Sequence, residues 1–250
     1  VGIAAPIVGV VQSDIASRTK FFSEEWEFEA LEYSDTGYLD SEPVIGDLTG
    51  DGDLEIVVGL TDGLVMALDA TGKDLWTFTK TGRIETQPTL GDLTGDGILD
   101  VIVPYDGSNI YALNGQDRTV LWEYTIGGNY IASAALSDLN GDGTPDVIVG
   151  SDSEDLYALN GKNGTVLWSS HLSGRITSRP VMANVTADAM LDVIIGTTYN
   201  HLYALDGTDG TKLWEKSTED DLRYTPALGD INNDGNNEIV IGDSGSFLSD

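Results

Sequence analysis

Short β-branched runs recur along this chain, and each follows an acidic loop that contains small or polar residues. In the first copy, the loop and the run together read GDLTGDGDLEIVVG, from Gly46 to Gly59. Four close versions follow, and the first polar position of each loop comes 45 or 46 residues after the previous one. A period of this length is typical of proteins built from one repeated supersecondary unit.

The β-branched runs predict buried strands, because they are short, continuous and rich in Val and Ile. After each run come a polar turn and two alternating segments, such as NIYALN and TVLW, around a turn rich in Asp, Asn and Gly, which is a hairpin signal. Each repeat is therefore expected to form four antiparallel strands, as in a propeller blade. The runs are Glu55–Val58, Asp100–Val103, Asp146–Val149, Asp192–Ile195 and Glu238–Ile241.

The tryptophans predict how many blades there are. Four of the five recur every 46 residues, at 76, 122, 168 and 214, in the last strand of a repeat. The last copy, from Pro226 to Asp250, lacks such a strand, and residues near Phe22 to Leu31, with Trp26, could supply it. We therefore expect residues 21–250 to form one all-β, five-bladed β-propeller, closed by an N-terminal strand that leaves no exposed edge. The alternative is a fragment of a longer array.

Residues 1–20 form a separate apolar N-terminal segment, whose longest apolar run is Val1 to Val11. Eleven residues are too few to cross about 30 Å of hydrocarbon at 1.5 Å per residue, so we expect no complete membrane span. Three roles stay open: a capping strand, the remnant of an export signal, or an assembly segment that contacts a protein partner or another copy.

The acidic loops are the strongest chemical signal. In the first copy, side-chain oxygens lie at loop positions one, three, five and nine, from Asp47, Thr49, Asp51 and Glu55. A hard cation that takes six to eight oxygen ligands would relieve their repulsion, and calcium fits better than zinc because no Cys or His is near. Turn chemistry alone explains the Asp, Asn and Gly content, but it does not explain the acid at position nine. The loop is not an EF-hand, since position twelve is Val58.

We expect about four or five calcium ions, each held by these side chains and the position-seven carbonyl. The fourth copy is expected to be weak or empty, because Ala187 and Ala189 replace its glycines. The predicted ligands are Asp47, Thr49, Asp51, Asp53 and Glu55; Asp92, Thr94, Asp96, Ile98 and Asp100; Asp138, Asn140, Asp142, Thr144 and Asp146; Asp230, Asn232, Asp234, Asn236 and Glu238; and, at the weak site, Asn184, Thr186, Asp188 and Asp192.

The two halves of each repeat resemble two known families. The acidic loop with its strand resembles the calcium-binding FG-GAP/VCBS propeller repeat of integrin-type propellers. The half that reads YALDG, then TG, then LW resembles the PQQ-like, quinoprotein-type repeat. Together the resemblances run from about Pro43 to the C-terminus and imply a β-propeller. They imply less about function, because such propellers serve adhesion, assembly, polysaccharide handling and redox catalysis.

Composition and motifs argue against several functions. With 42 acids against 12 bases, the net charge of −30 argues against nucleic acid or an anionic membrane as a partner. The charge is consistent with a secreted, marine or saline setting without choosing among them, and we expect an extracellular or cell-surface location. No catalytic site is evident, since neither His171 nor His201 lies in a catalytic or metal-binding spacing. A quinoprotein dehydrogenase would need more blades and often has adjacent cysteines, whereas this chain has none. Glycosidases need two carboxylates across a cleft. Four acids could reach a central mouth: Asp40, Glu42, Glu85 and Asp221.

A binding surface is the better-supported prediction. The loops that lead into each first strand share one face with the loops after each second strand, opposite the calcium loops, and on that face the repeats differ. Aromatic, Arg and amide groups suit recognition of a protein or a glycan. We therefore predict a non-catalytic binding, adhesion or assembly module, with a lectin-like propeller and a polysaccharide-acting glycosidase or lyase as alternatives. The candidates are Tyr38, Arg83, Tyr105, Asn129, Tyr130, Arg175, Tyr199, His201, Arg223 and Tyr224.

Overall fold

The computed structural model describes residues 10–11, 27–28, 37–107, 109–186, 190–233 and 237–244. All regular elements in this part of the chain are β-strands, as the repeats predict. The described residues therefore include no helix of the length and apolar character that a membrane crossing needs.

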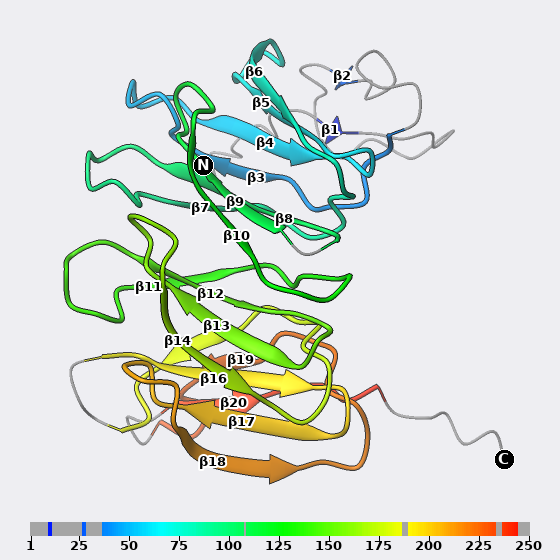
Figure 1. Ribbon diagram of the computed structural model, residues 1–250, viewed down its shortest axis with the longest axis vertical. Coiled ribbons are helices and arrows are strands. Elements are labelled where there is room, and N and C mark those ends of the chain that lie inside the picture. The colour runs from blue at the N-terminus through cyan, green and yellow to red at the C-terminus, as the bar shows by residue number, and fades with distance from the viewer. Residues whose placement is uncertain are drawn as a thin grey trace, which may run out of the picture.

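Each of the first four repeats forms one four-stranded antiparallel sheet in which strands adjacent in sequence pair (Figure 1). The strands of the first two repeats are β3 (Val44–Gly46), β4 (Glu55–Gly59), β5 (Leu64–Leu68) and β6 (Asp74–Thr79), then β7 (Thr89–Gly91), β8 (Asp100–Tyr105), β9 (Asn109–Leu113) and β10 (Val120–Thr125). Those of the next two are β11 (Ala135–Ser137), β12 (Asp146–Gly150), β13 (Asp155–Leu159) and β14 (Val166–His171), then β15 (Val181–Ala183), β16 (Asp192–Thr197), β17 (His201–Leu205) and β18 (Lys212–Ser217).

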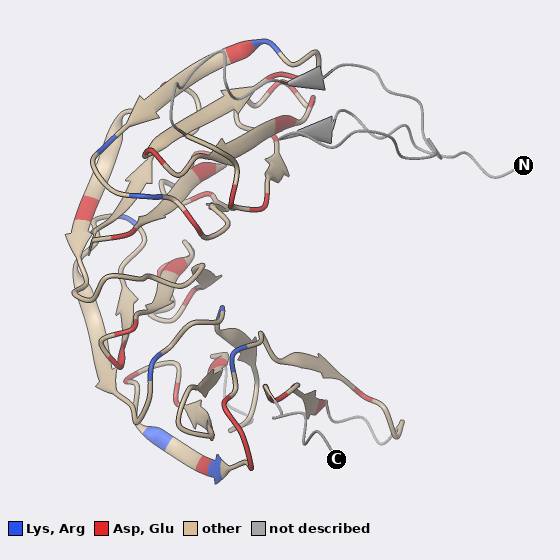
Figure 2. Ribbon diagram, turned by 90° about the vertical axis from the view of Figure 1, so that its right-hand side faces the viewer, with Lys and Arg blue, Asp and Glu red and all other residues tan. Residues whose placement is uncertain are grey.

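The fifth repeat contributes an antiparallel pair, β19 (Ala227–Gly229) with β20 (Glu238–Val240). Viewed from the side, the sheets follow one another along an arc, with the β3–β6 sheet at one end and the β19–β20 pair at the other (Figure 2). The four-stranded repeat predicted from the sequence is confirmed in four copies. The part of a third strand expected in the fifth copy falls on residues 245–250, outside the described residues.

The core lies between neighbouring sheets. The second strands are buried along their whole length in the first four repeats, as expected for continuous apolar runs. One cluster joins Val57 and Val65 of the first sheet to Val101 and Val103 of the second. Similar clusters join the second sheet to the third and the third to the fourth, so each sheet is stabilised by its neighbours.

Of the predicted closing strand, near Phe22 to Leu31, the structure describes only Glu27 and Phe28, and Trp26 lies outside the described residues. The two residues that follow it form β2 (Glu27–Phe28), which pairs in parallel with β1 (Val10–Val11). Within the described residues, β2 makes no pairing with β19 or β20. The sequence did not anticipate the parallel pair, and ring closure stays a prediction. Apart from β1, residues 1–20 also lie outside the described part.

The recurring tryptophans join one repeat to the next. Trp76, Trp122 and Trp168 are each only 6% exposed. Their indole N–H groups donate to main-chain carbonyls 39 residues later, in the next sheet, and such buried bonds fix how two sheets meet. The acceptors are Gly115 at 2.6 Å, Gly161 at 2.6 Å and Gly207 at 2.8 Å.

The acceptor glycines leave no room for a side chain. A Cβ atom added to Gly161 would lie 1.9 Å from the carbonyl oxygen of Pro145, and the same distance separates the other two positions from Leu99 and Leu191. Close approach of main chain to main chain therefore requires glycine at these three junctions.

Candidate metal loops and binding face

In the first loop, the position-one carboxylate organises the turn. Asp47 Oδ1 accepts the Gly50 N–H at 2.7 Å, and its Oδ2 accepts the Gly52 N–H at 3.0 Å. Both glycines have positive φ, of 78° and 91°, which explains why the loop uses glycine there. The second and third loops repeat these bonds from Asp92 and Asp138, so three copies share one turn geometry.

The position-nine acid is buried beneath each of the first four loops. Asp100, Asp146 and Asp192 are at most 1% exposed, and each accepts the N–H of the second loop residue through one oxygen, at 2.7 to 3.0 Å. Burial raises the pKa of Asp100 and Asp146, and these N–H groups act in the opposite direction. Each acid thus fastens the start of its own loop.

The same acid also reaches the inter-repeat junction. The Gly161 N–H donates to Asp146 Oδ1 at 3.0 Å, while the Gly161 carbonyl accepts the Trp122 indole. Asp100 and Asp192 bind Gly115 and Gly207 at 3.4 and 3.3 Å. The expectation that only a metal could explain the position-nine acid therefore needs correction, since this acid has a structural task of its own.

The first loop fits a hard cation best. The Thr49 hydroxyl oxygen, at position three, is buried and has no hydrogen-bond partner in the described residues. Asp51 is exposed beside it, and an oxygen-only donor set is what calcium takes. No group of three or more His, Asp or Glu in the described residues is gathered as a metal site. In the first loop, Asp47, Thr49, Asp51 and the Asp53 carbonyl would hold calcium, which would supply positive charge that cross-links the turn.

The later loops differ in ways the sequence did not predict. In the third, Lys162 lies 3.4 Å from Asp142, and a hydrogen bond from Thr144 lowers the pKa of Asp142 to about 2. In the fourth, Thr186 turns its hydroxyl to Asp192 at 3.1 Å. In the fifth, Asn232 donates to Glu238 at 3.0 Å. Three predicted ligands lie outside the described residues, namely Asp188, Asp234 and Asn236.

A second set of loops gathers at the opposite end of the strands. In every repeat, an N–H after the second strand donates to a carbonyl of the loop that leads into the first strand. This regular bond confirms that the two kinds of loop share one face, which we call the variable face. The pairs are Thr61 to Tyr38 at 3.0 Å, Asp106 to Arg83 at 2.8 Å, Asp152 to Tyr130 at 3.1 Å, Thr198 to Arg175 at 3.0 Å and Ser244 to Asp221 at 2.9 Å.

Two adjoining cavities open on the variable face. The first, of about 350 Å³, is lined by lead-in loops of all five repeats, and we call it the mouth. The second, of about 360 Å³, lies over repeats three to five and shares Tyr130, Thr177 and Arg223 with the mouth. The mouth walls are Asp40 and Glu42; Glu85, Thr86 and Gln87; Tyr130 and Ser133; Thr177, Ser178 and Arg179; and Arg223, Tyr224 and Thr225.

Half of the ten candidate residues line these cavities: Tyr130, Arg175, Tyr199, Arg223 and Tyr224. The structure brings them together from three repeats. Tyr199 has a φ of 103°, a strained value for a residue with a side chain, and it is 60% exposed.

The other five candidates have other surroundings. Tyr105 is fully buried and its hydroxyl donates to the Gly63 carbonyl at 3.1 Å, so it supports the fold. Arg83 binds Tyr38 and pairs with Glu85, at 3.1 and 2.7 Å. The remaining two point elsewhere: the Asn129 main chain bonds to Asp152 and Gly107, and the His201 ring lies 2.9 Å from Glu215 on β18.

The acids proposed for a glycosidase line the two cavities, and two of them pair with arginines. Asp40, Glu42 and Glu85 line the mouth, while Asp221 lines the neighbouring cavity. Arg83 pairs with Glu85 and Arg223 pairs with Asp221, both at 2.7 Å.

Sequence reasoning missed seven of the residues that line the mouth, and three of these are Thr177, Ser178 and Arg179. They occupy the lead-in loop of the fourth repeat, where the second repeat has Glu85, Thr86 and Gln87. Comparing lead-in loops position by position would have found them.

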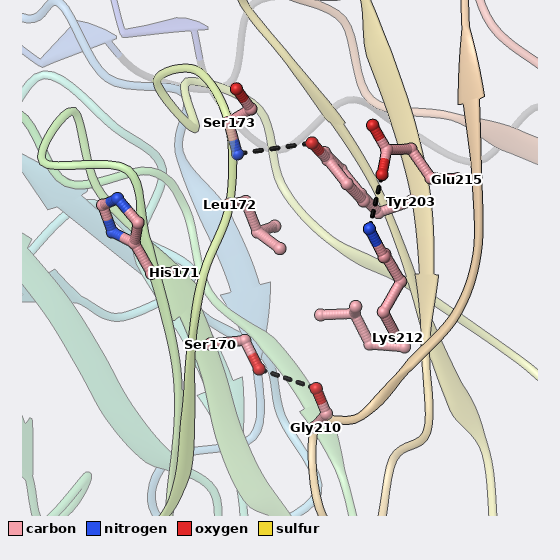
Figure 3. A pocket seen from close by; sticks show the side chains of 9 residues that line it. Ser170, His171, Leu172, Ser173, Tyr203, Gly210, Lys212 and Glu215 are labelled. Carbon is pink, nitrogen blue, oxygen red and sulfur yellow. Dashed lines mark hydrogen bonds and ion pairs between the residues drawn. The ribbon is translucent and has the colours of Figure 1, made fainter.

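A third depression, of about 390 Å³, lies at the seam between the third and fourth repeats. Its polar groups bind one another, as Figure 3 shows. Ser170 donates to the Gly210 carbonyl at 2.7 Å, the Ser173 N–H donates to the Tyr203 hydroxyl at 3.3 Å, and Lys212 pairs with Glu215. These mutual contacts make the seam a packing joint between the repeats.

Solved structures resemble this chain at low sequence identity. Saccharomyces cerevisiae Sqt1 matches with a TM-score of 0.63 and 13% identity, over 82% of this chain and 56% of that one. A BBS1 fragment in complex with ARL6 matches with a TM-score of 0.59 and 14% identity, over 91% and 66%. BamB from Moraxella catarrhalis matches with a TM-score of 0.47 and 19% identity, over 71% and 61%.

The chain spans 52% to 66% of the length of the solved chains it matches, and at these identities the likeness concerns the fold alone. No curated protein matches the sequence.

Two family models match consecutive parts of the chain. The model for the FG-GAP-like repeat matches residues 47–103 and 92–149. The model described as outer membrane protein assembly factor BamB matches residues 139–246. The two matches follow the repeats described above, and they agree with the two resemblances found in the sequence. The first part of the chain is therefore similar to FG-GAP-like repeats, and the second part is similar to a BamB-like, PQQ-type repeat region.

Proposed function

We propose that this chain is a non-catalytic binding or assembly module that recognises a protein partner through the variable face. The observation that carries the proposal is the pair of adjoining cavities, whose walls come from different residues of different repeats. A ligand without internal symmetry needs such unlike contacts. The match to an assembly-factor model and the likeness to a BBS1 fragment solved with ARL6 support a binding role.

The proposal includes a ring of five blades. Its support is that the lead-in loops of all five repeats line one mouth. The repeat register also places the Ala70 carbonyl of the first repeat where Gly115, Gly161 and Gly207 accept a tryptophan N–H in later repeats. A tryptophan from a closing strand, for which Trp26 is the candidate, would dock there.

We further propose that calcium stabilises the loops and that the protein works outside the cell or at the cell surface. The buried, unpartnered Thr49 hydroxyl supports a bound cation in the first loop. The excess of acids over bases suits a setting with abundant calcium.

Site-specific crosslinking in the producing cells tests the binding face. A photoreactive phenylalanine analogue replaces Tyr199 in one variant and Leu75, an exposed residue of the outer strand β6, in a matched control. We expect one discrete crosslinked species from position 199 and none from position 75. The Arg175→Glu change in the same chain should remove that species while leaving the melting temperature unchanged. Equal crosslinking from both positions would refute the proposed face.

A lectin-like function is the second candidate. Tyr199 and Tyr224 are 60% and 59% exposed beside the cavities, and exposed aromatic rings suit stacking on sugars. A glycan array separates the two functions, since a lectin binds a defined glycan without any protein partner.

A further inference from the structure

The mouth contains a cationic group without a partner. Arg179 lines it, is exposed, and makes no ion pair within the described residues. Two other arginines of the variable face are held by acids, Arg83 by Glu85 and Arg223 by Asp221. A guanidinium that lacks a counter-charge favours an anionic ligand, and carboxylates match its planar fork.

Hydroxyl groups beside Arg179 also lack partners. Ser178 is 5% exposed, and its Oγ makes no hydrogen bond within the described residues. The Oγ1 of Thr177, next to it in the same wall, is likewise without a partner there. Buried hydroxyls usually find a partner inside the protein, so two that do not, in one cavity wall, leave hydrogen-bonding capacity for an ordered water or a ligand.

Another part of the mouth carries negative charge. Asp40 and Glu42, from the lead-in loop of the first repeat, are exposed and make no ion pair within the described part of the chain. Acids therefore come from the first two repeats and arginines from the last two. This separation favours a ligand with both charges over a purely anionic one, which the acids would repel.

We propose that the mouth binds a peptide segment of the partner that carries a carboxylate for Arg179 and a cationic side chain for Asp40 and Glu42. The inference rests on the proposed function and specifies its ligand. A mouth of about 350 Å³ admits a few side chains rather than a folded surface. Acidic sugars supply the carboxylate without the cation, and they are an outcome of the test.

The test uses the whole chain and fluorescent peptides with one Lys and one Glu separated by zero to four glycines. Fluorescence anisotropy should show one spacing that binds at least about tenfold more tightly than peptides with Lys→Gln or Glu→Gln. Tenfold corresponds to about 1.4 kcal/mol. Arg179→Gln should remove the preference for Glu, and the Asp40→Asn, Glu42→Gln pair should remove the preference for Lys. Arg118→Gln is the control, because Arg118 binds the Thr77 carbonyl away from the mouth.

Each possible result either supports or overturns the proposal. Equal binding of charged and neutral peptides overturns the proposal, as does binding of galacturonate oligosaccharides more tightly than any peptide. If Arg179→Gln leaves both the peptide preference and the crosslink from position 199 unchanged, this inference fails while the proposed function stands. Loss of that crosslink with Arg175→Glu, together with peptide binding lost in Arg179→Gln, supports both.

Discussion

The two ends of the strands follow different rules. At one end, which we call the loop edge, lie the acidic loops and the turns between third and fourth strands. There the side-chain bonds repeat: the same carboxylates, glycines and tryptophans recur in consecutive repeats at nearly the same distances. On the variable face only the main-chain bond recurs, and the side chains around it change from repeat to repeat.

The difference separates what the fold requires from what recognition requires. The loop edge fixes each sheet to the next through bonds that involve main chain on one side, so few residue types fit. The variable face is already held by main-chain bonds, so its side chains are free to differ. Substitutions at the loop edge should therefore cost stability, whereas substitutions on the variable face should change binding and pH dependence.

The largest effect is expected from Gly161→Ala. The added Cβ would lie 1.9 Å from the Pro145 carbonyl oxygen, beside the Gly161 carbonyl that accepts the Trp122 indole N–H. We expect a loss of about 3–5 kcal/mol in unfolding free energy, measured by urea denaturation. Gly229→Ala is the control, since a Cβ there meets nothing within 4 Å and should change stability by under about 1 kcal/mol. Equal stability of the two variants would refute the docking account.

The next effect distinguishes a buried loop acid from an exposed one. Asp146→Asn replaces an acceptor of two main-chain N–H groups, from Leu139 and Gly161, with an amide that accepts through one atom only. We expect about 2 kcal/mol of destabilisation in the presence of a chelator. Asp142→Asn, at the exposed position five of the same loop, should cost much less under that condition. The reverse order would mean that the position-nine acid serves only a metal.

The fold was predictable because the same sequence pattern recurs five times. The period, the buried strands and the tryptophan spacing gave the four-stranded unit, and the loop register placed the variable face opposite the acidic loops. What the tryptophans bind was not predictable, since their acceptors are main-chain carbonyls of another repeat. Nor was the second role of Asp146, because a carboxylate under a loop looks the same in sequence whether it binds a cation or an N–H group.

The site was predictable only in part. Exposed aromatic and basic residues of the variable face were found by their variation, and five of them line the cavities. Tyr105 is also a variable aromatic residue, but it is buried, because side-chain direction at the end of a strand depends on packing. Ser178 was missed because a serine carries no signal until its surroundings show that it lacks a partner.

Calcium should sharpen the contrast between the two ends, because only the loop edge is expected to bind it. Extracellular calcium modules bind with dissociation constants of about 10⁻⁴ to 10⁻³ M. About 10 mM calcium should then add about 1.4–2.7 kcal/mol for each occupied site, seen as a higher melting temperature that a chelator reverses. Asp96→Ala should lower the bound stoichiometry by one, while Thr186→Ala, in the fourth loop, should leave it unchanged. A melting temperature that changes with neither calcium nor chelator would contradict calcium binding.

The smallest effect concerns pH, and it has opposite signs at the two ends. On the variable face, burial and the nearby Glu85 and Asp152 raise the pKa of Asp106 to about 6, with Arg83 acting against them. The folded state then holds this proton more tightly than the unfolded chain, so stability falls as the pH rises from about 4 to about 6. Asp106→Asn should remove that loss. Because water screens the partly exposed carboxyl, we expect a gain of about 1 kcal/mol at pH 7 and none at pH 4.

Asp117, in a turn of the loop edge, is the matched control for this last prediction. N–H and hydroxyl groups of Thr119 bind its carboxylate at 2.9 and 2.7 Å and lower its pKa. Here the folded state favours the charged form, so the stabilisation is present at neutral pH and is lost as the pH falls through the folded pKa. Asp117→Asn should accordingly weaken the protein slightly at pH 7, whereas Asp106→Asn strengthens it. Thermal melts of both variants at pH 4 and pH 7 test this prediction. If the melting temperatures of the two variants shift in the same direction at pH 7, the two ends do not differ electrostatically.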